Sequence, residues 1–149
     1  MASTPVPTAS GTDLTWSAPA TWTAKPNGAM RKGSFSVKGE GGEADLSITA
    51  FPGSTGGLLA NLNRWRGQLG LAPLGENELD TNSVHLDVAG LQLVSVDFAG
   101  NAGGKPTRIL GAIVPNGSDT WFFKLMGPDT LVANQKPAFL EFLRTIKSR

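Results

Sequence analysis

The chain has 149 residues, of which 40% are hydrophobic and 17% charged, a balance that supports a buried core and excludes wholesale disorder. Thirteen Lys and Arg against 12 Asp and Glu give a net charge of +1, so we expect no nucleic-acid partner. The lack of cysteine excludes disulfides, thiolate metal ligands and thiol nucleophiles. No apolar run approaches the about 20 residues that cross a bilayer, so we expect no membrane insertion by this domain.

Residues 1–13 consist mainly of Pro, Ser, Thr and Gly, the composition of a flexible leader, and we interpret residues 14–149 as a single globular domain. A spacer of this type often follows a removed targeting segment or lipid anchor, and an ordinary frayed terminus is the alternative. We therefore expect a domain of the cell envelope or periplasm, with a lipid tether upstream as one form. A cytoplasmic location is the alternative.

Short strands and turns are predicted before residue 53. Trp16 and Trp22 flank Pro19, and an Asn27-Gly28 pair that favours a tight turn completes a hairpin-like start. Strands are predicted over 33–39 and 43–51, joined by a glycine-rich turn. The second strand alternates an apolar face with a polar face, formed by Leu46, Ile48 and Ala50 and by Asp45, Ser47 and Thr49, respectively.

An amphipathic helix is predicted over 58–70, after the glycine-rich turn 53–57. One stripe of the helix is apolar and is expected to face the core; it comprises Leu58, Leu62, Trp65 and Leu69. Polar residues occupy both flanks, with Asn61, Arg64 and Gln68 on one side and Asn63 and Arg66 on the other. A Pro, Gly and Asn loop then extends to about residue 83.

Strands dominate the second half of the chain. Residues 84–88 alternate, with Val84, Leu86 and Val88 opposite His85 and Asp87, and a further strand is predicted from residue 91. Residues 107–127 predict a hairpin through Pro115, Asn116 and Gly117, and its second strand is apolar on both faces around Trp121, Phe122 and Phe123.

The chain ends in a predicted helix. Asp129 is placed to cap it, Pro137 is expected to kink or restart it, and one buried stripe comprises Phe139, Phe142, Leu143 and Ile146. Runs of strands with hairpin-length turns and only two helical segments indicate an α+β fold, a central antiparallel sheet with helices packed on it.

Residues 14–149 resemble the PsbP-like family in the order of elements, the two tryptophans around Pro19, the LVSVDFAG and TWFFKLMG strands and the closing FLEFLRTIKS helix. This superfamily includes the extrinsic PsbP subunit of photosystem II, a nuclear-import factor that releases nucleotide from Ran, and bacterial envelope proteins. The resemblance implies an antiparallel sheet sandwiched between helices and used for protein binding. The extended charged arm of PsbP and a histidine-carboxylate cluster are missing here, so no family site residue is carried over.

The glycine-rich turn before the first helix suggests an anion site at Ser54, Thr55, Gly56 and Gly57. Its backbone N–H groups lie at the positive end of the helix dipole, and no acid in the first turn offsets that end. Against this, Leu58 and Leu59 stand where a phosphate loop has Lys followed by Ser or Thr. A Ser or Thr that simply caps the helix is the favoured interpretation.

The sequence patterns that suggest a catalytic or metal site are incomplete. The G-x-T-x-G turn resembles a hydrolase nucleophile elbow, with Thr55 as nucleophile, His85 as base and Asp87 or Asp97 as the orienting acid. That elbow belongs to a parallel α/β sheet, which is not the fold predicted here. His85 and Asp87 supply two of the four ligands of a closed metal site, and no calcium spacing joins the acidic loop residues Glu76, Glu78 and Asp80.

The tryptophans and Asn116 also receive structural interpretations. Trp65 and Trp121 are predicted to be buried, and Trp16 and Trp22 to close one end of the core rather than to stack on a sugar. Asn116 lies in a glycosylation acceptor sequence, which we interpret as turn chemistry.

The sequence thus predicts a non-enzymatic, protein-binding or scaffold domain of an exported bacterial protein, without a metal or cofactor and present as a monomer or weak homodimer. Its partner-binding face is predicted on the first helix, at Asn61, Arg64, Arg66 and Gln68, because guanidinium and amide groups suit carboxylate or backbone recognition. Solvated side chains without a partner are the alternative for this face. The rival function is a small-anion or other small-ligand binding domain, or a weak hydrolase, that uses the glycine-rich turn.

Overall fold

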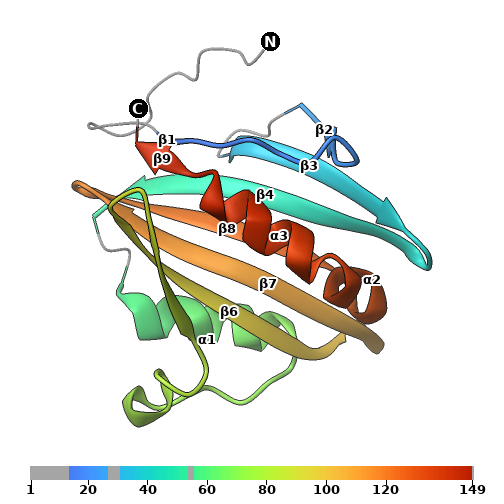
Figure 1. Ribbon diagram of the computed structural model, residues 1–149. Coiled ribbons are helices and arrows are strands. Elements are labelled where there is room, and N and C mark those ends of the chain that lie inside the picture. Colours follow the sequence, from blue (N-terminus) through green and yellow to red (C-terminus); the bar gives the residue numbers. More distant parts are fainter. Residues whose placement is uncertain (1–13, 27–30, 54–55, 149) are drawn as a thin grey trace.

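The structure, a computed structural model, describes residues 14–26, 31–53 and 56–148 (Figure 1). Within these ranges the strands are β1 (Leu14–Thr15), β2 (Thr23–Ala24), β3 (Arg31–Gly39), β4 (Gly42–Pro52), β5 (Val84–Val88), β6 (Leu91–Ala102), β7 (Lys105–Asn116), β8 (Asp119–Pro128) and β9 (Lys147–Ser148). The helices are α1 (Leu58–Gln68), α2 (Asp129–Asn134) and α3 (Lys136–Arg144), with a 3₁₀ turn η1 (Glu76–Glu78). The predicted α+β class is confirmed, and the leader 1–13 lies outside the described residues.

Seven of the described strands form one antiparallel sheet in the order β2-β3-β4-β8-β7-β6-β5, and β1 pairs with β9. The predicted hairpins β3–β4 and β7–β8 are confirmed, with Gly39 opposite Gly42 and Asn116 opposite Asp119. A two-residue turn at Ala89 and Gly90 joins β5 to β6, and both residues have the positive φ that this turn requires. The pairing of β4 with β8 joins distant parts of the chain and closes the sheet at its centre.

Helices α2 and α3 cover one face of the sheet, in front of β7 and β8 in Figure 1. The predicted stripe on the last helix is confirmed, since Phe139, Phe142 and Leu143 are buried against Leu46, Ile48, Leu110, Phe123 and Leu125. Ile146 is also buried, although α3 ends two residues before it. The strand segment 121–123 is buried on both faces, as predicted.

Helix α1 packs on the opposite face of the sheet. Its stripe residues Leu62, Trp65 and Leu69 are buried against β6, β7 and β8, and Leu58 is partly buried beside them. The indole of Trp65 lies directly over Gly111, where an added Cβ would clash with three ring atoms. Gly111 therefore allows α1 to approach the sheet closely.

Two predicted helix caps are wrong. The N-cap of α1 is Gly57, which has no side chain to bond the first turn, and Ser54 and Thr55 lie outside the described residues. The N-cap of α2 is Pro128, and the Asp129 carboxylate instead accepts a hydrogen bond from Arg108 at 2.7 Å. The break expected near Pro137 is confirmed, because a new helix begins at Lys136 with that proline in its first turn.

The two tryptophans near the start close one end of the core, as predicted. Trp22 is buried against Phe142, with ring centroids 5.2 Å apart, and its indole N–H donates to Gln135 Oε1 at 3.1 Å. Trp16 is partly buried edge-on to Phe123. Strand β2 pairs antiparallel with β3, which confirms the hairpin-like start, and its turn at Asn27-Gly28 lies outside the described residues.

Candidate functional site

Helix α1 covers only part of its face of the sheet, because its buried stripe packs on β6, β7 and β8. The strands β3 and β4 turn polar residues toward the same side, including Ser34, Ser36, Ser47 and Thr49. Ser47 and Thr49 alternate with Leu46 and Ile48 of the core, and Ser34 and Ser36 alternate with Phe35 and Val37. A hydroxyl-bearing half of the sheet is therefore left beside the helix.

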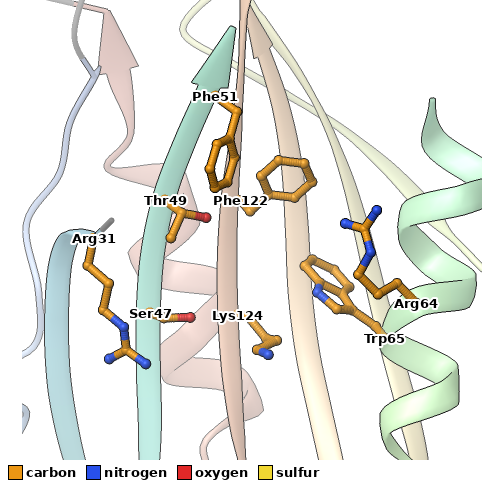
Figure 2. Close-up of a pocket in the computed structure, with 8 residues that line it drawn as sticks. All are labelled: Arg31, Ser47, Thr49, Phe51, Arg64, Trp65, Phe122 and Lys124. Atoms are coloured by element: carbon orange, nitrogen blue, oxygen red, sulfur yellow. The ribbon is translucent and has the colours of Figure 1, made fainter. Parts of the chain in front are cut away.

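A cavity of about 290 Å³ lies between α1 and this polar half-sheet. We call it the cationic groove; Figure 2 shows its lining residues, Arg31, Ser47, Thr49, Phe51, Arg64, Trp65, Phe122 and Lys124. Arg31 comes from β3, Lys124 from β8 and Arg64 from α1, so three elements supply its cations. The aromatic part is continuous, since the ring of Phe122 lies 6.1 Å from that of Phe51 and 6.3 Å from that of Trp65.

Asp45 holds the outer wall of the groove. Its carboxylate accepts from Lys25 Nζ at 2.7 Å and from Arg31 Nη2 at 2.9 Å. Burial alone would raise the pKa of Asp45, but the hydrogen bonds and charges of Arg31 and Lys25 outweigh burial and hold the pKa below its usual value. Arg31 is thus both neutralised and fixed in orientation, and it also donates to Ser34 Oγ at 2.9 Å.

Lys124 and Arg64 are held differently, by amide groups. Lys124 Nζ donates to Gln68 Oε1 at 3.0 Å, and Arg64 Nη1 donates to Asn61 Oδ1 at 2.8 Å. Burial lowers the pKa of the Lys124 ammonium, and Arg31 adds to that shift while Asp45 opposes it. Among the described residues neither cation forms a salt bridge, so each can accept an anion from outside without first breaking an ion pair.

The four residues predicted as a partner-binding face divide into two groups. Arg64 and Gln68 are exposed on the flank beside the groove. Asn61 is only 2% exposed and donates to the Gly57 carbonyl at 2.7 Å, so its place in an exposed face is wrong: it positions Arg64 instead. Arg66 lies on the other flank, 5.0 Å above the Phe98 ring, and donates to the Ala72 carbonyl at 2.8 Å.

Two groove cations, Arg31 and Lys124, were not predicted as site residues. Lys124 lies in a strand that sequence analysis interpreted as buried on both faces, and its alternation with Phe123 and Leu125 is the signal that places it opposite the core. Arg31 reaches the groove because β3 has a register shift between Arg31 and Gly33, which puts Arg31 opposite Thr49. No sequence signal marks that bulge.

The glycine-rich turn lines a second cavity, of about 530 Å³, with Gly53, Gly57 and Asn61 among its residues. Gly56 has a φ of 93° and Gly57 a φ of 92°, a conformation that favours glycine. Asp119 also lines this cavity; the residue is 5% exposed and its Oδ1 has no hydrogen-bond partner among the described residues. The negative charge of a buried carboxylate disfavours a second anion here, which weakens the predicted site at Ser54, Thr55, Gly56 and Gly57.

Asp97 does not fit the hydrolase arrangement. His85 pairs with Val94, so its side chain shares the face of Val94 and lies opposite to that of Asp97. Asp97 accepts from Arg108 at 2.6 Å and from Lys136 at 2.8 Å on the α3 side, so its use as the orienting acid is wrong. Burial opposes ionisation of Arg108, but Asp129 and Asp97 raise its pKa above the usual value. Thr55 lies outside the described residues.

The structure also shows where the remaining candidate residues from the sequence lie. Within the described ranges, no three His, Asp or Glu side chains are grouped to hold a metal ion, and His85 and Asp87 are exposed on the edge strand. Trp65 and Trp121 are 6% and 2% exposed, as predicted. Glu76 and Glu78 lie in η1 and Asp80 follows it, all exposed, and Asn116 is buried where β7 ends.

The fold has relatives among solved structures. LpqN, which is involved in cell envelope biogenesis of Mycobacterium tuberculosis, matches with a TM-score of 0.66 and 13% identity over 97% of this chain and 89% of that chain. Cyanobacterial PsbP from Synechocystis sp. PCC 6803 matches with a TM-score of 0.57 and 12% identity, over 95% and 94% of the two chains. A Pseudomonas aeruginosa protein of unknown function gives a TM-score of 0.56 and 12% identity, over 93% and 98%.

The chain therefore has the PsbP-like fold, which confirms the resemblance drawn from its sequence. At identities of 12–13% the likeness concerns the fold alone. No protein-family profile and no curated protein sequence matches the chain. None of the described helices has the length and apolar character of a membrane span.

Proposed function

We propose that this chain is a non-catalytic protein-binding domain of an exported bacterial protein, and that it recognises an acidic segment of its partner in the cationic groove. The observation that carries the proposal is a pair of cations beside an aromatic floor, Arg64 and Lys124, neither of which has a salt-bridge partner among the described residues. Protein folds rarely leave a half-buried lysine without an anion, since desolvating its charge costs free energy. A partner carboxylate would supply that anion.

The chemistry of the groove favours a carboxylate over other groups. The Arg64 guanidinium is planar and can bind a carboxylate through two parallel hydrogen bonds, and the Asn61 amide limits the rotamers it can adopt. The Lys124 ammonium is partly desolvated, which strengthens its attraction to an anion. Ser47 and Thr49 add hydroxyl donors along β4.

The aromatic floor favours a peptide over a free anion. Phe51, Phe122 and Trp65 form one apolar surface, and a free carboxylate or phosphate has nothing to pack on it. An acidic residue next to an aromatic or branched side chain satisfies both parts of the groove, and aromatic contacts of this kind carry much of the binding free energy in protein interfaces. The ligand class we propose is thus a segment with alternating acidic and apolar residues.

The exported location is supported by two observations. The Pro, Ser and Thr composition of residues 1–13 is typical of a spacer after a targeting segment. The described domain also shares its fold with LpqN, a protein of cell envelope biogenesis.

Binding is tested with a fluorescein-labelled peptide pool of alternating Glu and Phe or Leu, against an isosteric pool in which Gln replaces Glu. We expect the Glu pool to bind more tightly, and Arg64→Glu or Lys124→Glu to weaken it at least about tenfold, which corresponds to about 1.4 kcal/mol. The matched control is Arg144→Glu, the same charge change on the opposite face, where the side chain is 61% exposed.

Equal binding of the two pools, or equal weakening by Arg144→Glu, would contradict recognition in the groove.

The same assay distinguishes peptide binding from the alternative function, binding of a small anion. Inorganic phosphate added at constant ionic strength should compete poorly with the peptide if the aromatic floor contributes, whereas full competition at about millimolar phosphate would favour a plain anion site.

A further inference from the structure

Strand β5 is the last strand of the sheet, and among the described strands only β6 pairs with it. Val84 at its start is 60% exposed, and His85 and Asp87 are exposed on the opposite face. Leu86 is half-buried against the main core. Beside β5 on the α3 side lies a groove of about 420 Å³, to which Val84, Leu86 and Leu140 contribute apolar surface.

The backbone of β5 has two residues that face outward. Val88 and Leu91 close the two-residue hairpin to β6, and hydrogen-bonded and non-bonded pairs alternate along an antiparallel ladder from that point. Val84, Leu86 and Val88 therefore direct their N–H and C=O groups to β6, and His85 and Asp87 direct theirs to the open side. Among the described residues, no other element forms a backbone hydrogen bond with these two.

The sequence of β5, Val-His-Leu-Asp-Val, is complementary to itself when read in the opposite direction. We propose that β5 pairs antiparallel with β5 of a second copy of this chain, about a two-fold axis at Leu86. In this register His85 lies opposite the partner's Asp87, and Val84 opposite the partner's Val88. The outward N–H and C=O groups of His85 and Asp87 then bond across the interface, and each imidazole donates to a carboxylate.

Neighbouring registers are disfavoured by charge. A shift that centres the axis on His85 places two imidazoles opposite one another, and a shift to Asp87 places two carboxylates opposite one another. If the axis instead falls between two neighbouring residues, each outward-facing residue lies opposite one whose N–H and C=O groups face β6, so the backbone hydrogen bonds cannot form. Only the axis at Leu86 gives two imidazole–carboxylate pairs and a central apolar pair.

Edge strands usually carry features that prevent such pairing, and the two edges of this sheet differ in them. At the other edge β2 is only two residues long, and β3 carries Lys38 near its exposed last residues and a register shift with β4 near its first residue, Arg31. Strand β5 has no Pro, no Lys and no register shift over its five residues. Pairing would also cover Val84 and bring the grooves of the two copies together on the α3 side.

The register is tested by oxidative cross-linking, because the chain has no cysteine of its own. In Leu86→Cys the two thiols meet at the axis as a non-bonded pair, a spacing that suits a disulfide, and we expect a covalent dimer. The matched control is Val84→Cys, whose thiols would lie four residues out of register. Faster cross-linking of Val84→Cys, the more exposed position, or none in either variant, would overturn the proposal.

Charge variants provide a second test that does not alter the half-buried Leu86. His85→Asp places two carboxylates opposite one another, and we expect it to raise the dimer dissociation constant at least about tenfold in sedimentation equilibrium. The exchanged variant His85→Asp with Asp87→His restores both imidazole–carboxylate pairs and should return the constant to near the original value. A wild-type chain that stays monomeric up to about 500 µM, or no recovery in the exchanged variant, would overturn the proposal.

Discussion

Replacing Gly111 with alanine tests whether the Trp65 indole fixes the position of α1 on the sheet. Gly111 lies in β7 between Val96 of β6 and Lys124 of β8. An alanine Cβ there would lie 2.8 Å from Cη2 and 2.9 Å from Cε3 of Trp65, and closer still to Cζ3. Carbon atoms pack at about 3.5–4.0 Å, so the ring must move by roughly 1 Å or more.

The free-energy cost of Gly111→Ala depends on where the Trp65 ring can move. Trp65 is 6% exposed and packs edge-on to Phe122, so its ring can relieve the clash only by shifting toward the cationic groove that it lines or by lifting α1. Overpacking of this kind typically costs about 1–3 kcal/mol, and the reduced entropy of the unfolded alanine chain returns about 0.4–1 kcal/mol. We expect a net loss of about 1–2 kcal/mol, and a fall in Tm of about 2–4 °C for each kcal/mol.

Urea denaturation followed by tryptophan fluorescence measures this loss. The control is Gly67→Ala on the exposed side of α1, where an added Cβ meets nothing within 4 Å and helix propensity should stabilise the fold by about 0.5–1 kcal/mol. Trp65→Leu removes the ring that clashes, so Gly111→Ala should cost less in that background. A cost below about 0.5 kcal/mol in the wild-type background would refute the placement of Trp65 over Gly111.

Three further variants test other parts of the structure. Asp45→Asn should reduce the loss of stability in acid: the folded-state pKa of Asp45 is lowered, so its ion pairs stabilise the fold above about pH 4 and are lost as pH falls through that pKa. Urea titrations from about pH 6 to pH 2 measure the free energy of unfolding of both proteins. An equal fall in this free energy for the wild type and Asp45→Asn would contradict the prediction. Gln135→Met leaves the buried Trp22 indole without its acceptor and should cost about 1–3 kcal/mol, a penalty that Trp22→Phe in the same chain should reduce. Arg108→Met should cost about 2–3 kcal/mol because it leaves the Asp97 and Asp129 carboxylates without their shared donor, and Arg108→Lys should recover only part of that loss in thermal melts.

Local patterns were sufficient to predict most elements. The alternation around Leu46, the stripe through Leu62 and Trp65, and the two-sided burial of Phe122 all depend on neighbours one to four residues apart. Such periodicity reflects which side of an element meets the core, and it therefore survives in the sequence. The caps at Gly57 and Pro128 were missed because a cap depends on one or two backbone angles, which few residues specify.

The candidate site was predicted only in part. Arg64 and Gln68 were placed on an exposed flank because helical spacing fixes which residues share a side. The burial of Asn61 and the packing of Arg66 on Phe98 were not predicted, since both depend on how the loop after α1 and the strands beneath it surround the helix.

The sequence by itself determined which residues are apolar on which side of each strand and helix, and hence the α+β class. Only the tertiary structure decided that β4 pairs with β8, which places Arg31, Lys124 and Arg64 around one groove although they are far apart in the chain. It also left β5 as an edge, so that a self-complementary strand has no neighbour on one side within the described part of the chain. The physical reason is that a side chain's orientation is set locally, whereas its neighbours across the sheet depend on contacts among all the elements.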